Sequence, residues 1–423
     1  MNAVTELSEV GQYPTASRYV DFDIDPAFDV DPYTPLLEVS KRAPVVAGRN
    51  GIFHGVRVPN NFLYPDKEQD VYLALSYDAV RQVAIGHETF SSERGYGNTL
   101  RIAFGKTLMS MDEPEHGRYK RLVLPSFSHR MVTDGLARIA QPIIDTCLDK
   151  IVDTGQGELV SQFTTIFPYQ VVAKIFGVPP AMHAEAEQLV VDACKMGENP
   201  QKAIAALQSM NAIYQKVVDE HRLQPLDDLT QALMNTELDG GKLTDDEIVS
   251  FMKQIIAAGL DTTVRQTANL IYLLLENPEQ FEELKQNRSL LENAIWESLR
   301  LLSAGGIIPR MATKDATICG VRIPAGSGVY GVQHIANLDE TRYDQPLKFN
   351  LHRKRVPIMT FGAGVHACLG ANLSIAEIKI AMVGVLDRLP NLRKDPKRWP
   401  GTVVRGFQLR SPTKLPVLWD PVR

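Results

Sequence analysis

The sequence has few cysteines and no CxxC pair: Cys147, Cys194, Cys319 and Cys368 lie far apart in 423 residues. This spacing gives no sign of a disulfide framework or a structural zinc site, and it suits a reducing cytoplasm. An excess of basic charge is also missing, since 45 lysines and arginines stand against 50 aspartates and glutamates. The net charge of −5 offers no general attraction for phosphates, so we expect no binding to nucleic acid.

Long apolar stretches and repeats are missing too. We find no run of about 18 apolar residues, which a membrane-spanning helix would need, and no secretion signal at the start of the chain. We therefore expect a cytoplasmic protein without a membrane anchor. No low-complexity tract, internal repeat or Gly/Ser linker divides the chain. Residues 1–20 are expected to form a polar tail, and residues 21–423 one large domain.

Helical patterns dominate what is present. Hydrophobic residues make up 44% of the chain, enough for a large core, and their helical periodicity dominates residues 114–302. The longest predicted helix begins at Thr244, whose side chain forms a capping box with that of Glu247. It can continue to Asn277, because Pro278 then stops it. About 32 residues would make this helix roughly 48 Å long.

The remaining predicted elements are shorter. Ser289 and Glu292 form a second capping box and predict a helix that ends near Leu302. Two β-rich runs between residues 317 and 335 are separated by PAG and predict a hairpin. An amphipathic helix is expected between residues 370 and 390, followed by a tail that alternates as strands do. The predicted fold class is mainly α with small β-sheets.

One cysteine lies in a glycine-rich loop, FGAGVHACLG at residues 361–370, directly before that last helix. Gly362, Gly364 and Gly370 allow the backbone to turn where a side chain would clash. Backbone amides at the helix start and the positive end of its dipole favour a thiolate at Cys368. From these residues alone, Cys368 is a metal ligand, a nucleophile or a buried structural residue.

The loop resembles the haem-binding loop of the cytochromes P450, which it matches at Phe361, Gly364, His366, Cys368 and Gly370. The resemblance implies that Cys368 is the axial thiolate ligand of the iron of haem b. It implies cofactor contacts for Phe361 and His366. It also implies a single large haem domain with a long central helix, in agreement with the helical pattern.

A charged pair occurs on the helix WESLRLL, where Glu297 and Arg300 lie three residues apart on one face. Such pairs are common on exposed helices, and there they contribute little. Here ESLR resembles the ExxR element of the P450 family, and Arg353 in FNLHR matches the third member of its network. The resemblance implies a structural network of these three residues, which braces the haem loop from outside the pocket.

The segment AAGLDTT, residues 257–263, interrupts an apolar face of the long helix. Threonine hydroxyls can bond back to helix carbonyls and open the hydrogen-bond ladder, although a solvated polar turn would have the same composition. The segment resembles the oxygen-activating element of the family. The resemblance implies Thr262 as the alcohol beside bound dioxygen and Asp261 as its acidic partner in a proton relay.

Two further segments resemble parts of the family that bind the haem propionates. His116 in MDEPEHGRYKRL and Arg310 in IIPRMAT match two such residues. Lys120 stands where arginine is common, Ile358 where histidine is common, and Leu338 in ANLD where arginine is common. Lys120 can donate as a point charge, whereas Ile358 cannot donate at all. We therefore expect propionate anchoring that includes Lys120 and departs from the family's usual set.

The resemblance also implies a substrate pocket, walled by residues 91–105, the long helix, residues 303–308 and VVRGFQL. The pocket residues it implies are Ala257, Ala258, Ile307, Ile308 and Phe407. Their apolar character favours a small apolar substrate such as a terpenoid, a steroid or an aromatic compound. Ordinary core packing would have the same composition.

The activity implied by the resemblance is that of a haem-thiolate monooxygenase, which inserts one oxygen atom of O2 into a C–H bond. No reductase-like segment follows the haem loop, so a soluble ferredoxin and a ferredoxin reductase are the expected electron donors. Arg118, Lys120 and Arg121 form a basic patch that would suit the ferredoxin, or is only a solvated face. Alternatives are a peroxygenase, coupling oxidase or dehydratase with the same haem, or a ligand-binding protein. The pair Asp261 and Thr262 favours the monooxygenase.

Overall fold

A computed structural model describes residues 33–48, 52–53, 56–57, 70–96, 104–127, 135–194, 200–238 and 240–421. The expected polar tail, residues 1–20, lies outside the described residues. The helices are α2 (Tyr33–Ser40), α3 (Tyr77–Ile85), α4 (Ser92–Tyr96), α6 (Glu115–Val123), α7 (Leu136–Asp149), α8 (Phe167–Ile175), α9 (Pro180–Cys194), α10 (Pro200–Leu223), α11 (Leu229–Asn235), α12 (Asp245–Glu276), α13 (Pro278–Gln286), α14 (Leu291–Leu301), α15 (Gln333–Ala336) and α16 (Ala371–Arg388).

The strands form small sheets. The largest has the order β1 (Val45–Gly48), β4 (Val71–Ala74), β12 (Gly328–Val332), β9 (Ile307–Ala312) and β5 (Phe90–Ser91). A second has the order β13 (Arg393–Lys394), β16 (Pro416–Leu418) and β6 (Gln156–Glu158). The pairs are β2 (Ile52–Phe53) with β3 (Val56–Arg57), β7 (Glu237–Leu238) with β8 (Gly241–Lys242), β10 (Ala316–Ile318) with β11 (Val321–Ile323), and β14 (Val404–Arg405) with β15 (Ser411–Pro412). The predicted fold class, mainly α with small β-sheets, is confirmed.

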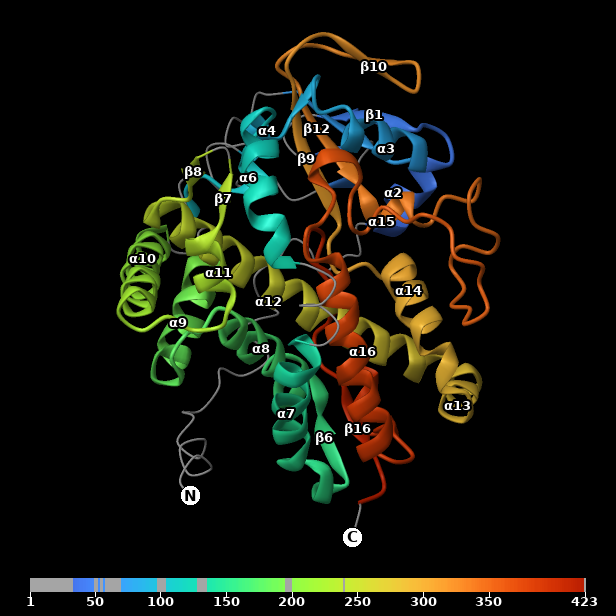
Figure 1. Cartoon of the computed structure of the whole chain (residues 1–423). Coiled ribbons are helices and arrows are strands. Elements are labelled where there is room, and N and C mark those ends of the chain that lie inside the picture. Colours follow the sequence, from blue (N-terminus) through green and yellow to red (C-terminus); the bar gives the residue numbers. More distant parts are fainter. Residues whose placement is uncertain are drawn as a thin grey trace.

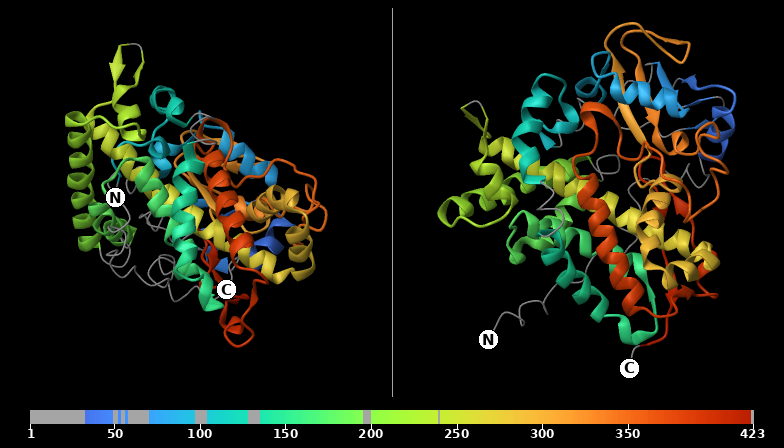
Figure 2. Two further views of the ribbon diagram at one scale, coloured as in Figure 1. Left: turned by 60° about the horizontal axis from the view of Figure 1, so that its bottom comes forward. Right: turned by 45° about the vertical axis from the view of Figure 1, so that its right-hand side comes forward.

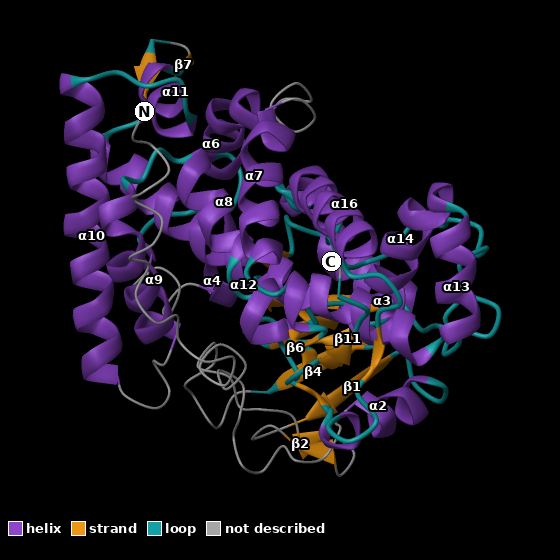
Figure 3. Cartoon of the chain, turned by 90° about the horizontal axis from the view of Figure 1, so that it is seen from below, coloured by secondary structure: helices purple, strands orange, loops and turns teal. Residues whose placement is uncertain are grey.

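The long helix α12 crosses the middle of the molecule, with α16 in front of it (Figure 1). The five-stranded sheet lies to one side of α12, whereas α9 and α10 lie on the other side in every view (Figures 1 and 2). Figure 3 shows the same division from below, with most strands gathered in one region and β7 apart from them beside α11. The helix therefore joins the helical and the strand-rich parts of the protein.

The predicted limits of α12 are confirmed. Its 32 residues begin after the capping box, in which Glu247 N donates to Thr244 Oγ1 at 3.3 Å and Thr244 N to Glu247 Oε2 at 2.7 Å. Buried residues occur around most of the helix, because α8, α10, α14 and α16 all pack against it. A helix that is enclosed on several sides supports apolar and buried polar residues together, and it can hold side chains rigidly toward a central cavity.

The second predicted capping box is wrong. Ser289 Oγ donates to Asn287 Oδ1 at 2.6 Å, and Glu292 Oε1 accepts from Arg355 at 2.7 Å. Helix α14 instead follows a 3₁₀ turn and begins at Leu291. The nearby asparagine and a distant arginine are better partners for the two side chains than the helix start, and neither could be recognised from the spacing of serine and glutamate.

The predicted hairpin is also differently paired. Strands β10 and β11 lie within the first β-rich run and turn at Cys319 and Gly320, whose φ angles of 47° and 83° suit a two-residue hairpin turn. The second run becomes β12, which pairs antiparallel with β9 and parallel with β4. The PAG segment thus connects a hairpin to the main sheet, in which β12 lies between β4 and β9.

Helix α16 departs from the expectation that long apolar stretches are missing. Among the described residues, the stretch Gly364–Arg388 holds a window with a mean hydropathy of 1.6, apolar and long enough for a membrane span. The helix packs against α7, α12 and α14, and Ile378, Ala381, Met382 and Val385 are buried. These four residues therefore belong to the core, whereas only 33% of the whole window is buried.

Candidate active site

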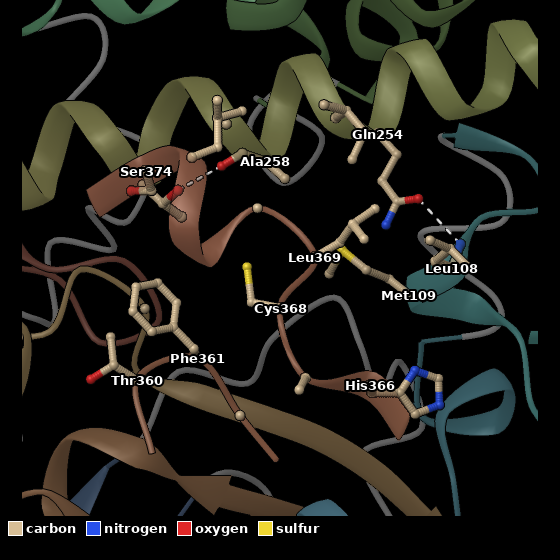
Figure 4. Close-up of a pocket in the computed structure, with 18 of the residues that line it drawn as sticks. Leu108, Met109, Gln254, Ala258, Thr360, Phe361, His366, Cys368, Leu369 and Ser374 are labelled. Carbon is tan, nitrogen blue, oxygen red and sulfur yellow. Dashed lines mark hydrogen bonds between the residues drawn. The ribbon is translucent and has the colours of Figure 1, made fainter. Parts of the chain in front are cut away.

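A cavity of about 330 Å³ lies between α12 and the glycine-rich loop that precedes α16 (Figure 4). Strand β9, helix α6 and the turn Leu108–Ser110 complete its walls. All six cofactor-binding residues predicted from the sequence line this cavity: His116, Lys120, Arg310, Phe361, His366 and Cys368. They come from three separate parts of the chain, so the fold assembles them.

Cys368 points its sulfur into the cavity (Figure 4). Its backbone N–H donates to the carbonyl of Phe361 at 2.9 Å, which closes the loop on itself. Gly364 has a φ of 72°, and a Cβ there would lie 3.1 Å from the Cα of Ile85 on α3. Both the left-handed backbone and the close approach therefore require glycine at this position. The loop holds the cysteine rigidly.

The thiol of Cys368 differs in acidity from the sequence prediction. The amides of Gly370 and Ala371 do bond to the sulfur, and with the charge of Lys120 they lower its pKa. Desolvation by the surrounding cavity walls is the larger effect, and it raises the pKa of Cys368 above the ordinary value although the sulfur is open to the cavity. The protein alone thus favours the thiol, whereas a metal cation bound to the sulfur would favour the thiolate.

Positive and polar groups collect at one edge of the cavity. The rings of His116 and His366 lie 4.1 Å apart between centroids, and Arg310 is buried on β9 beside them. Burial, together with the charges of Arg310, His116 and Lys120, lowers the pKa of His366 to about 3. His366 is therefore neutral, and its buried Nε2 has no hydrogen-bond partner among the described residues. This edge can bind carboxylates.

Lys120 takes part in this edge and not in an outer basic patch. Its Nζ donates to the carbonyl of Val365 in the cysteine loop, and burial lowers its pKa. Arg118 and Arg121 on the same helix are exposed. Ile358, which replaces the histidine common in the family, packs against the core and does not line the cavity as described. Lys120 and Arg310 thus supply the permanent positive charge of the cavity edge.

Thr262 and Asp261 lie in the middle of α12, but their side chains differ in direction. Thr262 lines the cavity, and its Oγ1 donates to the carbonyl of Ala258 at 2.6 Å, as the sequence predicts for a back-bonding threonine. Helix α12 nevertheless runs unbroken, so this bond does not open the ladder. Asp261 is outside the described cavity lining, because it accepts a hydrogen bond from Arg265.

The predicted pocket residues divide in the same way. Ala258, Ile307 and Ile308 line the cavity, whereas Ala257 and Phe407 are not among the described lining residues. One step along a helix turns by about 100°, so Ala257 and Ala258 face different directions. Phe407 is buried and stacks on the ring of Tyr33 at 5.3 Å. Residues 97–103 of the predicted wall lie outside the described residues.

The network predicted around Glu297 is present outside this cavity. Arg300 donates to the Glu297 carboxylate through Nε and a terminal nitrogen, both at 2.8 Å. Arg353 Nε donates to the same carboxylate at 2.9 and 3.0 Å. The Glu297 and Arg300 side chains are only 3% and 2% exposed, so they form a buried, charge-assisted cluster and not a surface pair.

This network reaches the cysteine loop through backbone contacts. Arg300 donates to the carbonyl of Asn337 at 3.0 Å. The Asn337 side chain in turn bonds to Met359 N at 2.7 Å and to Thr360 Oγ1 at 2.8 Å. Thr360 directly precedes the loop and lines the cavity. The contacts support the bracing role that the family resemblance implies.

Sequence analysis missed two polar residues of the cavity. Glu377 on α16 is buried, burial raises its pKa well above the ordinary value, and its Oε1 has no partner in the described part of the chain. A single acid within the apolar run LSIAEIKIAMVGV was a usable signal. Gln254 on α12 bonds to Leu108, which is 146 residues away. No local pattern could have indicated that contact.

The cavity suits an iron porphyrin. The described residues contain no cluster of three or more His, Cys, Asp or Glu side chains that could hold a bare metal ion. One thiol instead faces an apolar space, and Lys120, Arg310 and the unpartnered nitrogen of His366 lie at its edge. A planar group with a central iron and two peripheral carboxylates matches this donor set. The site is that of a haem-thiolate protein.

Comparison with known proteins agrees with this class. A family model described as Cytochrome P450 matches residues 189–398. Nocardicin C N-oxygenase of Nocardia uniformis subsp. tsuyamanensis is 32% identical, over 83% of this chain and 90% of its own length. Mycinamicin IV hydroxylase/epoxidase of Micromonospora griseorubida is 31% identical, over 88% of this chain and 96% of its own.

Solved structures show the same fold. Cytochrome P450 CYP109Q5 from Chondromyces apiculatus has a TM-score of 0.81 at 26% identity and covers 93% of this chain and 96% of its own. CYP109E1 from Bacillus megaterium in complex with testosterone has a TM-score of 0.79 at 25% identity, over 92% and 100%. The chain belongs to the cytochrome P450 family. It is a P450 monooxygenase, which uses haem, O2 and redox partners to oxidise an organic substrate.

Proposed function

We propose that this enzyme uses haem b to hydroxylate a small, largely apolar compound, such as a terpenoid, a steroid or an aromatic compound. In this proposal it works in the cytoplasm with electrons from a ferredoxin and a ferredoxin reductase. One observation carries the reaction type: the loop that bears Cys368 and the helix that bears Thr262 face each other across one cavity (Figure 4). Cys368 would hold the haem iron through its sulfur, and the Thr262 hydroxyl would border the same cavity from the helix side.

The residues of the cavity edge would hold the cofactor. Cys368 would bind the iron through Sγ, and Phe361 would pack beside it. His116, Lys120, Arg310 and His366 would bind the propionates; these four line one edge of the cavity. When bound, the haem supplies the redox chemistry by which O2 is reduced and one of its oxygen atoms is transferred to the substrate.

Residues of the chain must deliver the protons from solvent. Insertion of one oxygen atom from O2 into a C–H bond needs two electrons and two protons, and the second oxygen atom leaves as water. The Thr262 hydroxyl borders the cavity, and the Asp261 carboxylate next to it is 15% exposed. Once the carboxylate turns away from Arg265, an acid at the edge of the solvent and a hydroxyl inside would form a short proton path.

The walls of the cavity support an apolar substrate. Ile255, Val172, Ile175 and Phe176 line the side near α8 and α12, and Ile307 and Ile308 line the side near β9. The similar structure with testosterone and a relative named Vitamin D3 dihydroxylase support a steroid or terpenoid skeleton in this chain as well. An apolar skeleton that displaces water from these walls is stabilised by the hydrophobic effect.

The first experiment is the absorption spectrum of the reduced protein under carbon monoxide. We expect a strongly red-shifted Soret band in the unmodified protein and its loss in Cys368→Ala. Cys319→Ala is the matched control, because Cys319 is an exposed free cysteine on the distant β10–β11 turn. A protein that binds no haem, or a Cys368→Ala variant that keeps the band, would show that the proposed cofactor site is wrong.

A further inference from the structure

Gln254 is a buried polar residue on the wall of an otherwise apolar part of the cavity. It lies on α12, it is 7% exposed, and its Oε1 accepts a hydrogen bond from Leu108 N at 3.2 Å. A backbone N–H can only donate, so the oxygen of the amide must face Leu108. The amide nitrogen must then point the other way, and Figure 4 shows it on the side of the open cavity.

The other glutamines of the cavity have no such spare donor. Gln266 donates to Ser298 Oγ at 3.1 Å and accepts from Ala304 N at 2.9 Å. Gln333 donates to the carbonyls of Met359 and Thr360. Gln254 Nε2 has no hydrogen bond to the described residues, and it keeps surface that is open to the cavity. A donor in an apolar space without an acceptor is unfavourable, so a ligand that supplies an acceptor gains binding energy.

The donor is also held in place. Leu108 begins a 3₁₀ turn that is closed by Thr107 and Ser110, whose hydroxyls lie 3.1 Å apart. The bond from Leu108 N fixes the amide plane of Gln254, and Ile255 and Met109 beside it offer no competing acceptor side chain. Because the group is oriented before a ligand arrives, little conformational entropy is lost on binding.

We propose that Gln254 is a specificity-determining residue, whose Nε2 donates a hydrogen bond to a carbonyl oxygen of the substrate. The inference rests on the proposed function, in that the substrate occupies this cavity. The preferred substrates are then apolar skeletons with a carbonyl group. Gln254 precedes Thr262 by eight residues, about 12 Å along the helix. The carbonyl and the oxidised carbon therefore belong to different ends of the substrate.

The test uses a pair of rigid probes that differ in one group. 2-Adamantanone has a C=O group where 2-methyleneadamantane has C=CH₂, so the shapes match and only the ketone accepts a hydrogen bond. The haem-loaded full-length enzyme is titrated with each probe, and binding is followed by the spin-state shift of the Soret band and by calorimetry. We expect the ketone to bind about threefold to tenfold more tightly, the range of one neutral hydrogen bond.

Two variants distinguish the Nε2 donor of Gln254 from its hydrogen bond with Leu108 N. Gln254→Glu keeps an oxygen for Leu108 N and loses the donor when its carboxyl is ionised, and Gln254→Met loses both at any pH. Both variants should bind the two probes with similar affinity. Ile255→Val, which changes the shape of the neighbouring wall, should change both affinities together and leave their ratio intact.

Ketone binding that is absent, or no tighter than alkene binding in the unmodified enzyme, overturns the proposal, as does a ketone preference that survives in both variants. The carbon monoxide spectrum of the same preparations keeps the two ideas apart. A missing red-shifted band would overturn the proposed function, and the calorimetric ratio would still decide the role of Gln254.

Discussion

The carboxylate of Asp261 is bound by Arg265, one turn further along α12, with 2.8 Å between Asp261 Oδ1 and Arg265 Nε. Arg265 is 2% exposed and also reaches Leu409 O at 3.4 Å and Ser411 Oγ at 3.5 Å. The arginine thus links the centre of the long helix to the β14–β15 region. In this arrangement the acid faces its arginine, and it must turn from Arg265 to exchange a proton with the Thr262 side of the helix.

Asp261→Asn tests whether this carboxylate acts as an acid. The asparagine can still accept from Arg265, so the fold and haem binding should not change. Without a titratable group, the rate of substrate oxidation should fall about 100-fold, the lower range for general acid catalysis. The measurement is the rate of product formation under saturating substrate. Asp245→Asn is the control, because Asp245 pairs with Arg222 at the start of the same helix, far from the cavity. Equal rates in the two variants would remove Asp261 from the proton path.

Thr262→Ala should separate electron use from product formation. Without the hydroxyl, protons are no longer delivered in order, so reducing equivalents should appear largely as hydrogen peroxide while substrate binding persists. The measurement is the ratio of product to hydrogen peroxide per electron pair. Thr267→Ala is a matched control: Thr267 bonds back to Thr263 O at 2.8 Å but does not line the cavity. Thr262→Ser, which restores the hydroxyl, should recover the ratio. Retained coupling in Thr262→Ala would contradict the relay.

The sequence predicted the features of this structure that depend on residues close together in the chain. The cysteine loop and the limits of α12 depend on residues that are close in the chain, and both are found as expected. The pair Asp261 and Arg265 also had a local signal, since residues four apart share a helix face. Sequence analysis instead predicted Asp261 as the partner of the neighbouring Thr262, because the family motif ends before Arg265 and gives no information on that residue.

Long-range contacts were not predictable in the same way. The parallel pairing of β12 with β4 brings together segments that are far apart in the chain. The bond between Gln254 and Leu108 spans 146 residues. The aromatic side chain of Phe407 would suit a pocket wall, yet it packs on Tyr33. Apolar residues satisfy a core and a pocket equally, so only the tertiary structure distinguishes the two uses.

The buried network of Glu297, Arg300 and Arg353 should contribute strongly to the stability of the protein around the cysteine loop. Arg300→Met leaves the Glu297 carboxylate buried with one partner fewer, which should cost about 3–5 kcal/mol in the free energy of unfolding. Haem retention should fall with it. Arg355→Met is the control: Arg355 pairs with Glu292 at the surface, and its loss should cost at most about 1 kcal/mol. Denaturant unfolding of the holoenzyme measures both. Similar losses of unfolding free energy in the two variants would show that the buried network stabilises the protein no more than a surface ion pair does.

The exposed arginines of α6 should guide the electron donor. Arg118 and Arg121 are exposed on the helix whose Lys120 reaches the cysteine loop, so their charge lies close to the cofactor edge. Reversal of both to glutamate should lower the association rate with an acidic ferredoxin and weaken its dependence on salt. Stopped-flow reduction at several salt concentrations measures the effect. Lys216→Glu on α10 is the control charge reversal, with its side chain 64% exposed. An effect of equal size in Lys216→Glu would place the docking surface elsewhere.

Glu377 should make the stability of the enzyme depend on pH. Burial raises its pKa well above 4.5, so the folded protein keeps this carboxyl protonated at pH values where the unfolded chain loses the proton. The folded state then binds more protons than the unfolded state, and the free energy of unfolding falls as the pH rises from 4.5 toward the raised pKa. Glu377→Gln removes this dependence.

Glu377→Gln should therefore unfold at a higher temperature than the unmodified enzyme at neutral pH. The difference should disappear below pH 4.5, where the Glu377 carboxyl is protonated in both the folded and the unfolded state. Thermal unfolding of the holoenzyme across this pH range measures it. Asp387→Asn on the same helix is the control, because Asp387 is exposed and pairs with Arg288 at the surface. A difference between Glu377→Gln and the unmodified enzyme that stays constant with pH would mean that Glu377 has the same pKa in the folded and unfolded states, and it would contradict the prediction.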